Sequence, residues 1–437
     1  MARNMKDSGI EWIGEIPEGW EITKIKHIVS SVTDIDHFMP DSAEFGIPYL
    51  MIGDLKDLSS SIDWDSSKKI SIEDYKKLSI KSRPQIGDII FARYASIGTT
   101  CYIDTDHDFL VSYACLTIHP SNLIIGKFLS YYLKSSSFAE DVLRRTNSNT
   151  QGNVGKDSLL NVTIVLPSII EQTQIVNFLD AKCSDINAML SKTRSSIEEY
   201  KKLKQAVITQ SVTKGVRGER EMKDSGIDYI GQIPAKWVLG KLRNVGDTQN
   251  GISKSSEFFG KGFPFVSYSD VYKNYSLPFA VSGLVESTPE EQERYSVKEG
   301  DIFFTRTSET IEEVGFSCVC EKDIPNATFA GFLIRVRPFS DKLHTPYAKY
   351  YFRSTHLRFY LVKEMNLVTR ASLGQSLLKS MPVLLPPLEE QKEIADYLDA
   401  KCAEIDKLIA KKEQLVKELE SYKKSLIYEV VTGKREV

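Results

Sequence analysis

Two segments of the chain repeat apolar residues every seven positions. The first row is Leu179, Ile186, Thr193, Tyr200 and Val207, with Met189 and Leu203 beside it; the second is Leu398, Ile405, Leu419 and Leu426, beside Leu408, Leu415 and Tyr422. A sustained heptad repeat predicts helices that pack along an apolar seam. Prolines before each segment and glycines after it mark the ends, so each helix should span about 40 residues, on the order of 60 Å.

The seam segments belong to an internal repeat. MKDSGIEWIGEIPEGW at 5–20 returns as MKDSGIDYIGQIPAKW at 222–237, with 11 of 16 positions identical. LPSIIEQTQIVNFLDAKCSDIN from Leu166 likewise matches LPPLEEQKEIADYLDAKCAEID from Leu385. Each half is therefore an entry segment, a divergent block and a seam helix. We expect boundaries at 1–165 and 222–384 for the entry segments with their blocks, and at 166–221 and 385–437 for the helices.

The divergent blocks share one motif. Residues 87–93, GDIIFAR, parallel residues 300–306, GDIFFTR. The pattern predicts a Gly-Asp turn that leads into a buried strand ending on an arginine. We therefore expect an α+β protein, in which two α/β domains are joined by two long antiparallel coiled-coil helices. Tandem copies paired in this way are related by a pseudo-two-fold axis, with the blocks at opposite ends.

Composition restricts the class of protein. With 437 residues, 41% hydrophobic and 26% charged, the chain can form two or more globular domains. Six cysteines without a CxxC pair, and no run of about 18 apolar residues, predict a cytoplasmic protein without disulfides or membrane spans. The phosphate-loop, GxGxxG and HExxH patterns are absent from the sequence. We accordingly expect no catalytic site, no metal and no cofactor in this chain.

The net charge of −3 hides basic stretches in both blocks. The first contains Lys68, Lys69, Lys76, Lys77, Lys81 and Arg83; the second contains Arg335, Arg337, Lys342, Lys349, Arg353, Arg358, Lys363 and Arg370. Such stretches can hold phosphates without reading sequence. Solvated helix faces would have the same composition.

The combination of these features resembles one family. Alternating constant and divergent segments, the LPPLEEQ run at 385–391, both MKDSGIxxIGxIPxxW entries and the C-terminal VVTGK at 430–434 resemble the specificity subunit of type I restriction-modification systems. The resemblance covers essentially the whole chain. It implies two target recognition domains that each read half of a split, asymmetric site in double-stranded DNA, with the paired helices as the spacer. It also implies two modification subunits that use S-adenosylmethionine, and restriction subunits that use Mg-ATP.

The resemblance implies that side chains near the strand-end arginines read the bases. The candidates are Arg93, Tyr94, Ser96, Thr150 and Gln151 in the first block, and Arg306, Glu309, Thr369 and Arg370 in the second, with phosphates held by Lys68, Lys69, Lys76 and Lys77. Arginine can contact guanine through two hydrogen bonds. Alternatively, each strand-end arginine bridges a nearby carboxylate such as Asp88 or Asp301.

The repeated entry segments carry aromatic residues with two possible roles. Trp12, Trp20, Tyr229 and Trp237 either pack beneath the adjoining domain or dock the modification subunits. A different hypothesis for the whole chain is a coiled-coil adaptor whose divergent blocks bind proteins.

Overall fold

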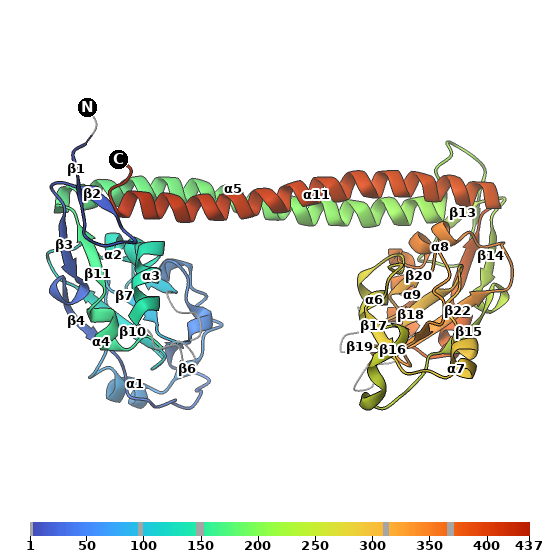
Figure 1. Cartoon of the computed structure of the whole chain (residues 1–437), viewed down its shortest axis with the longest axis horizontal. Helices are drawn as coiled ribbons and strands as arrows, with labels where there is room; N and C mark the ends of the chain where they lie inside the picture. The colour runs from blue at the N-terminus through green and yellow to red at the C-terminus, as the bar shows by residue number, and fades with distance from the viewer. Residues whose placement is uncertain (1–2, 95–98, 146–152, 309–313, 365–370) are drawn as a thin grey trace. The chain divides into compact units, whose positions relative to one another are not determined.

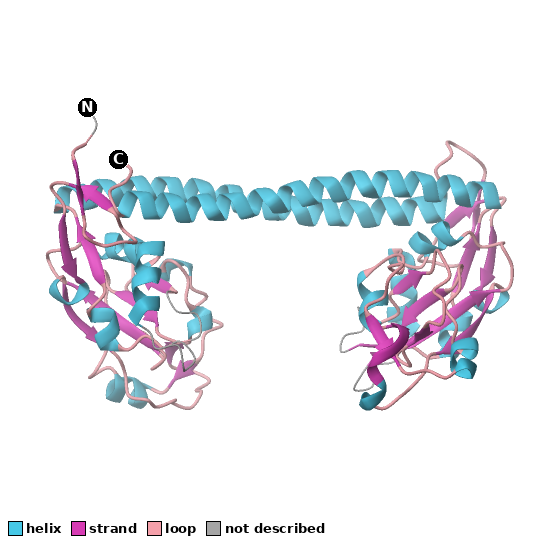
Figure 2. Ribbon diagram, in the orientation of Figure 1, coloured by secondary structure: helices cyan, strands magenta, loops and turns pink. Residues whose placement is uncertain are grey.

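The computed structural model describes residues 3–94, 99–145, 153–308, 314–364 and 371–437. The chain forms two compact units: the first contains 1–194 with 414–437, and the second contains 195–413. Both long helices pass from one unit to the other, so each unit contains part of each helix (Figure 1). Helices and antiparallel strands alternate in both units, as the sequence predicts for the fold class (Figure 2).

The seam segments form helices α5, Ile169–Lys214, and α11, Leu388–Val431. They are antiparallel within each unit. In the first, Arg194 contacts Glu420 at 2.6 Å and Lys423 donates to Asn187 at 2.9 Å; in the second, Lys204 contacts Asp406 at 2.6 Å. The ends of the main apolar rows are buried, whereas Thr193, Tyr200, Val207 and Leu419 are only half-buried, and Met189 and Leu203 on the companion row are about half exposed. Two helices can cover only one face of each other, which leaves this row at the margin.

Each unit holds a four-stranded antiparallel sheet in the same order. In the first unit these strands are β4 (Val29–Thr33), β10 (Cys115–Pro120), β7 (Ile89–Ala92) and β8 (Thr100–Tyr102). In the second they are β15 (Gly246–Asn250), β22 (Leu333–Pro338), β18 (Ile302–Thr305) and β20 (Ser317–Val319). The shared order shows that the divergent blocks are copies of one fold.

Smaller sheets complete both units. The first unit has β1 (Met5–Asp7) with β2 (Glu15–Pro17), β3 (Glu21–Lys24) with β11 (Thr163–Leu166), and β6 (Lys69–Ile70), β5 (Ile47–Leu50) and β9 (Leu110–Val111). The second has β12 (Met222–Asp224) with β13 (Gln232–Pro234), β14 (Val238–Lys241) with β24 (Pro382–Leu385), β19 (Thr307–Ser308) with β23 (Ala371–Ser372), and β17 (Gly283–Val285), β16 (Phe259–Val266) and β21 (Thr328–Phe329).

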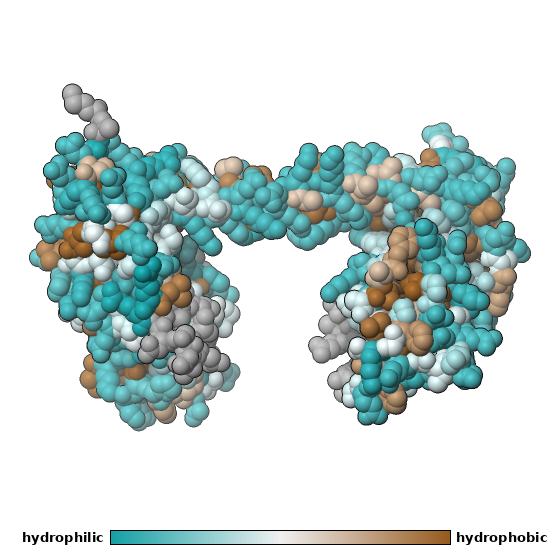
Figure 3. All heavy atoms as spheres, in the orientation of Figure 1, coloured by the Kyte–Doolittle hydropathy of each residue, from teal (hydrophilic) through white to brown (hydrophobic). Residues whose placement is uncertain are grey.

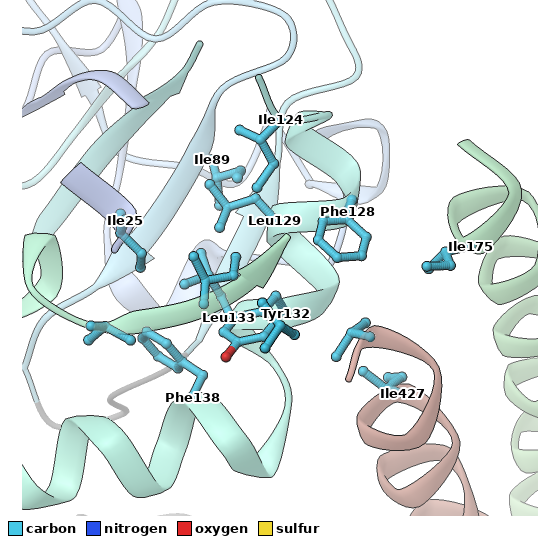
Figure 4. Close-up of a cluster of buried hydrophobic side chains, with 14 of the residues drawn as sticks. Ile25, Ile89, Ile124, Phe128, Leu129, Tyr132, Leu133, Phe138, Ile175 and Ile427 are labelled. Carbon is cyan, nitrogen blue, oxygen red and sulfur yellow. The ribbon is translucent and has the colours of Figure 1, made fainter. Parts of the chain in front are cut away.

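Short helices flank these sheets. They are α1 (Ile72–Leu78), α2 (Gly126–Leu133), α3 (Ser136–Arg145) and α4 (Lys156–Leu160) in the first unit, and α6 (Tyr268–Lys273), α7 (Pro289–Arg294), α8 (Thr345–Tyr351), α9 (Thr355–Glu364) and α10 (Gln375–Ser380) in the second. In the first unit, α2 presents Phe128 and Tyr132 to a core that also receives Ile175 of α5 and Ile427 of α11 (Figure 4). In the second, Ile208 of α5 and Ile394 of α11 enter the corresponding core. Each core thus needs the start of one long helix and the end of the other.

A matched set of polar contacts ties each entry segment to the start of a long helix. Trp20 Nε1 donates to Glu171 at 3.2 Å, and Arg3 pairs with the same carboxylate. In the second unit, Trp237 Nε1 donates to Glu390 at 3.1 Å, and Arg220 pairs with that carboxylate. We call each Arg-Trp-Glu set a clasp.

The glutamine after each clasp glutamate fixes the helix to its own domain. Gln172 accepts from Ile125 N at 2.8 Å and donates to Pro167 O at 3.0 Å. Gln391 accepts from His344 N at 2.8 Å and donates to Pro386 O at 2.9 Å. Both glutamine side chains are buried away from water, so these bonds within the protein are what satisfy their amide groups. These contacts explain why the Glu-Gln pair recurs at the start of both long helices.

The ends of the long helices close on the entry segments in the same way. Gly215 and Gly433 have φ of 78° and 73°, the left-handed conformation that ends helices on glycine. Lys434 Nζ donates to Ile13 O at 2.6 Å, and Lys214 Nζ donates to Ile230 O at 3.5 Å. The C-terminal segment of the chain thus lies on the first entry segment, as the end of α5 lies on the second.

The clasps differ in burial, which predicts unequal costs when they are broken. Glu390 is 2% exposed, whereas the Glu171 side chain is 30% exposed. Glu390→Ala leaves the buried indole N–H of Trp237 without its partner and takes the carboxylate from half-buried Arg220, so it should lower the free energy of unfolding by about 3 kcal/mol. Glu171→Ala should lower it by about 1 kcal/mol, since water can replace the carboxylate. Urea denaturation followed by tryptophan fluorescence measures both.

The matched control is Glu393→Ala, which removes an exposed partner of Arg217 and should leave the denaturation midpoint unchanged. Equal losses from Glu390→Ala and Glu393→Ala would contradict a stabilising role for the clasp.

Candidate functional site

The strand-end arginines occupy equivalent positions in the two units. Gly87 and Gly300 have φ of 93° and 85°, and all residues of β7 and β18 are buried. The Gly-Asp turn and buried strand predicted from the sequence are confirmed. Arg93 and Arg306 follow these strands directly, where the chain leaves the sheet.

Backbone hydrogen bonds place each arginine beside two loops. Arg93 N donates to Ala114 O at 3.0 Å, and Arg93 O accepts from Val154 N at 3.0 Å. Arg306 N donates to Phe332 O at 2.9 Å, and Arg306 O accepts from Leu373 N at 2.7 Å. Val154 and Leu373 follow the polar loops that the sequence singled out. The structure therefore brings the arginine and the end of that loop together in each unit.

The side chains of the two arginines have different surroundings. Arg93 Nη1 lies 3.0 Å from Asp34 Oδ2, and its guanidinium carbon lies 5.4 Å from the centre of the Tyr94 ring. Its Nε is buried without a hydrogen-bond partner. For the Arg306 side chain we find no hydrogen bond or ion pair within the described part of the chain.

Arg93 does bridge a carboxylate, as the alternative interpretation expected, but the carboxylate is that of Asp34 and not Asp88, and Arg306 does not pair with Asp301. Asp88 pairs with His119 Nδ1 at 2.9 Å, and Asp301 pairs with Arg337 at 2.6 Å. These partners come from β10 and β22, the strands that lie next to β7 and β18 in each sheet. The carboxylate that contacts Arg93 follows β4 instead. The sequence could not identify it because strand order is not visible in a linear pattern.

Several candidate residues lie outside the described residues. They are Ser96, Thr150, Gln151, Glu309, Thr369 and Arg370.

The basic stretch of the first block is partly exposed. Lys76 and Lys77 are exposed on α1, whereas Lys69 is half-buried in β6. Lys68 is also half-buried and donates to Pro40 O at 2.5 Å. Of the four candidate lysines, the two on α1 are therefore the ones exposed to a phosphate.

Much of the second basic stretch is internal. Arg353 donates to backbone oxygens of Ser317 at 2.6 Å and Val271 at 2.7 Å, and burial lowers its pKa. Arg335 is 7% exposed and donates to Ser296 O at 2.6 Å. Lys349 pairs with Asp399 at 2.7 Å. These cations hold the fold together, so counting charges along the sequence overstated the basic surface of this block.

The aromatic residues of the entry segments divide into two groups. Trp20 and Trp237 are 1% and 0% exposed and belong to the cores, which is the packing role. Trp12 is half-buried beneath the guanidinium of Arg144, 4.4 Å from the ring centre. Tyr229 is half-buried with its ring 6.1 Å from that of Phe359, and burial raises its pKa to about 12. Of these four aromatic residues, only Trp12 and Tyr229 have exposed side-chain surface that a partner protein could contact.

A cavity of about 310 Å³ in the first unit lies between α2 and the long helices. Asp180 accepts from Lys127 and from the Tyr131 hydroxyl, both at 2.7 Å. Burial opposes the charge of Asp57, but Lys134 and other contacts hold its pKa below the ordinary value. In the second unit Asp399 accepts from Tyr350 in the same way at 2.6 Å. The sequence did not single out this Tyr-Asp pair, although both of its residues recur in the second half after 219 positions.

The described part of the chain shows neither a metal site nor a membrane-spanning helix. Within the described ranges, no group of three or more His, Cys, Asp or Glu side chains could hold a metal ion. Among the described helices, none is long and apolar enough to cross a membrane.

Comparisons with known proteins identify the family. The model of the type I restriction modification DNA specificity domain matches residues 17–199 and again residues 234–418. A putative type I restriction enzyme MjaX specificity subunit of Methanocaldococcus jannaschii is 25% identical, over 97% of this chain and 95% of its own. The EcoKI specificity subunit of Escherichia coli K12 is 24% identical, over 87% and 82% respectively.

Solved structures share the fold. A chain from a study of complex assembly and conformational transition of the type I restriction-modification system has a TM-score of 0.74 at 19% identity, covering 96% of this chain and 99% of that one. The HsdS subunit of Thermoanaerobacter tengcongensis has a TM-score of 0.52 at 18% identity, covering 96% and 98%. The two matches of the family model coincide with the two copies of the repeat. This chain therefore belongs to the type I restriction-modification DNA specificity family, whose subunits are non-catalytic.

Proposed function

We propose that this chain reads a bipartite, asymmetric site in double-stranded DNA, one half-site for each unit. The observation that carries the proposal is the common backbone setting of Arg93 and Arg306, surrounded by different side chains. Equivalent backbone positions fit two domains that approach DNA in the same orientation. Different side chains suit two different half-sites, because base edges are distinguished by the donors and acceptors that meet them.

The exposed lysines of α1 would contact phosphates and set the register on the duplex without reading bases. Residues 146–152 and 365–370 would supply Thr150, Gln151, Thr369 and Arg370 as further base contacts. Family membership favours this function over the protein adaptor, since the matched model describes a DNA specificity domain.

We further propose that two modification subunits dock on this chain and methylate adenine with S-adenosylmethionine, and that restriction subunits with Mg-ATP join them in the cytoplasm. The entry segments recur in both units, so two copies of one partner can use equivalent surfaces. Trp12 against α3 and Tyr229 against α9 are the candidate surfaces. Phe359, beside Tyr229, is 63% exposed, and apolar side chains appear in patches on both units (Figure 3).

The function is tested by mapping methylated adenines in the source cell. With the gene and its modification subunit present, we expect one motif made of two short unlike blocks with a fixed number of unread bases between them. Deletion of this gene alone should abolish methylation at that motif. Retention of the motif after deletion would contradict the assignment.

The long helices should set the number of unread bases. One heptad inserted after Arg194 in α5 and another after Glu413 in α11 add about 10 Å, or about three base pairs of duplex. The methylated motif should then carry about three more unread bases between unchanged half-sites. A heptad in α5 alone, as the control, should abolish methylation because the seam is shifted out of register. An unchanged spacer in the double insertion would refute this role.

The docking surfaces should act independently. Trp12→Asp or Tyr229→Asp places a charge on one apolar surface, so each variant should bind one modification subunit instead of two, and the double variant none. Native mass spectrometry of the assembled complex counts the subunits. Phe45→Asp, at an 82% exposed position in the first divergent block, is the control and should leave two bound. Two subunits bound to the double variant would place docking elsewhere.

A further inference from the structure

The register of the first unit's sheet places Asp34 beside the strand-end arginine. Thr33 on β4 lies opposite Thr117 on β10, and Thr117 lies opposite Ile90 on β7. Asp34 is the next residue after Thr33, so it leaves the sheet on the side where β7 ends at Arg93. Its carboxylate then reaches Arg93 Nη1 at 3.0 Å.

The same register in the second unit identifies the counterpart of Asp34. Gln249 on β15 lies opposite Arg335 on β22, which lies opposite Phe303 on β18. Phe303 and Ile90 hold the same place in the Gly-Asp strand, so Asn250 is the structural equivalent of Asp34. Its side-chain oxygen is buried without a hydrogen-bond partner. The carboxylate of the first unit is thus replaced by a neutral amide that leaves Arg306 unpaired among the described residues.

The Asp34–Arg93 pair is better suited to orienting the arginine than to stabilising the fold. The Asp34 side chain is 39% exposed, so water can replace its carboxylate and its loss should cost little stability, whereas the Arg93 side chain is 15% exposed. The pair does restrict a long side chain, which also lies over the Tyr94 ring. Arg93 uses only Nη1 for this bond, and its Nε has no partner. Nε is enclosed by the protein, so the donors left for an outside group are those of Nη2, for which we find no partner among the described residues.

Guanine is the base that fits such a group. It presents two acceptors, O6 and N7, side by side in the major groove, and an arginine held in a fixed orientation can donate to both. We infer that Asp34 is a positioning residue, which orients Arg93 to read a guanine in the first half-site, and that Asn250 leaves the second half-site without an equivalently oriented arginine. This inference rests on the proposed DNA-reading function.

The decisive experiment maps methylated adenines in cells that carry the complete complex with Asp34→Asn. The readout is a ratio, methylation at sites changed at one base divided by methylation at the parent site, so it does not depend on the amount of complex. In the wild type, one position of one half-site should require guanine. Asp34→Asn should reduce selectivity at that position alone by about tenfold, since one base contact of this kind typically accounts for such a factor.

Matched variants separate orientation from folding. Asp34→Glu keeps the carboxylate and should restore part of the selectivity, whereas Arg93→Lys should lose it as Asp34→Asn does, because lysine lacks the planar pair of donors. Asn250→Asp should leave the first half-site unchanged and alter the second only.

Three outcomes would overturn the inference: an unchanged motif in Asp34→Asn, a loss of selectivity spread over both half-sites, or a relaxed position that is not guanine. Absence of any split motif in the wild type is a separate result, which would overturn the proposed function itself.

Discussion

Each core of this protein is completed by a helix end from the other half of the sequence. α5 starts from the first unit and ends in the core of the second, and α11 does the reverse. The clasps anchor the starts through Glu171 and Glu390, and the lysines at 214 and 434 anchor the ends. Neither half can bury its apolar surface alone. The repeated segments are therefore constrained by packing, whatever else they contact.

This constraint separates the positions that must stay constant from those that can vary. In both units an aspartate of the Gly-Asp turn is paired with a side chain from the neighbouring strand, His119 in one and Arg337 in the other. In both, a tyrosine on a domain helix donates to an aspartate on a long helix. The partners change while the contacts remain. Divergence in the blocks has thus replaced side chains while keeping the contacts that carry the fold.

The sequence predicted what periodicity and repetition can encode. The antiparallel seam helices, the duplicated halves and the buried strand after each Gly-Asp turn all rest on local patterns, and the structure confirms them. The role of Trp20 and Trp237 remained open because an apolar ring in a repeated segment suits a core and a docking surface equally. Charge counting along the second block failed because Arg335 and Arg353 satisfy backbone oxygens far away in sequence. Asp34 was missed because strands distant in the chain bring it to Arg93.

The positions of the two arginines are fixed by main-chain bonds, and this explains how one fold can serve two half-sites. Arg93 and Arg306 are each held through N and O by the loops on either side, and backbone bonds do not depend on the identity of the side chain. A substitution at the position of Asp34 or Asn250 therefore changes how the guanidinium is oriented without moving the strand that carries it. Selectivity can then change in one unit at little cost in stability. Because the units share the backbone position of the arginine but differ in the residue beside it, a substitution beside one arginine leaves the other unit unchanged.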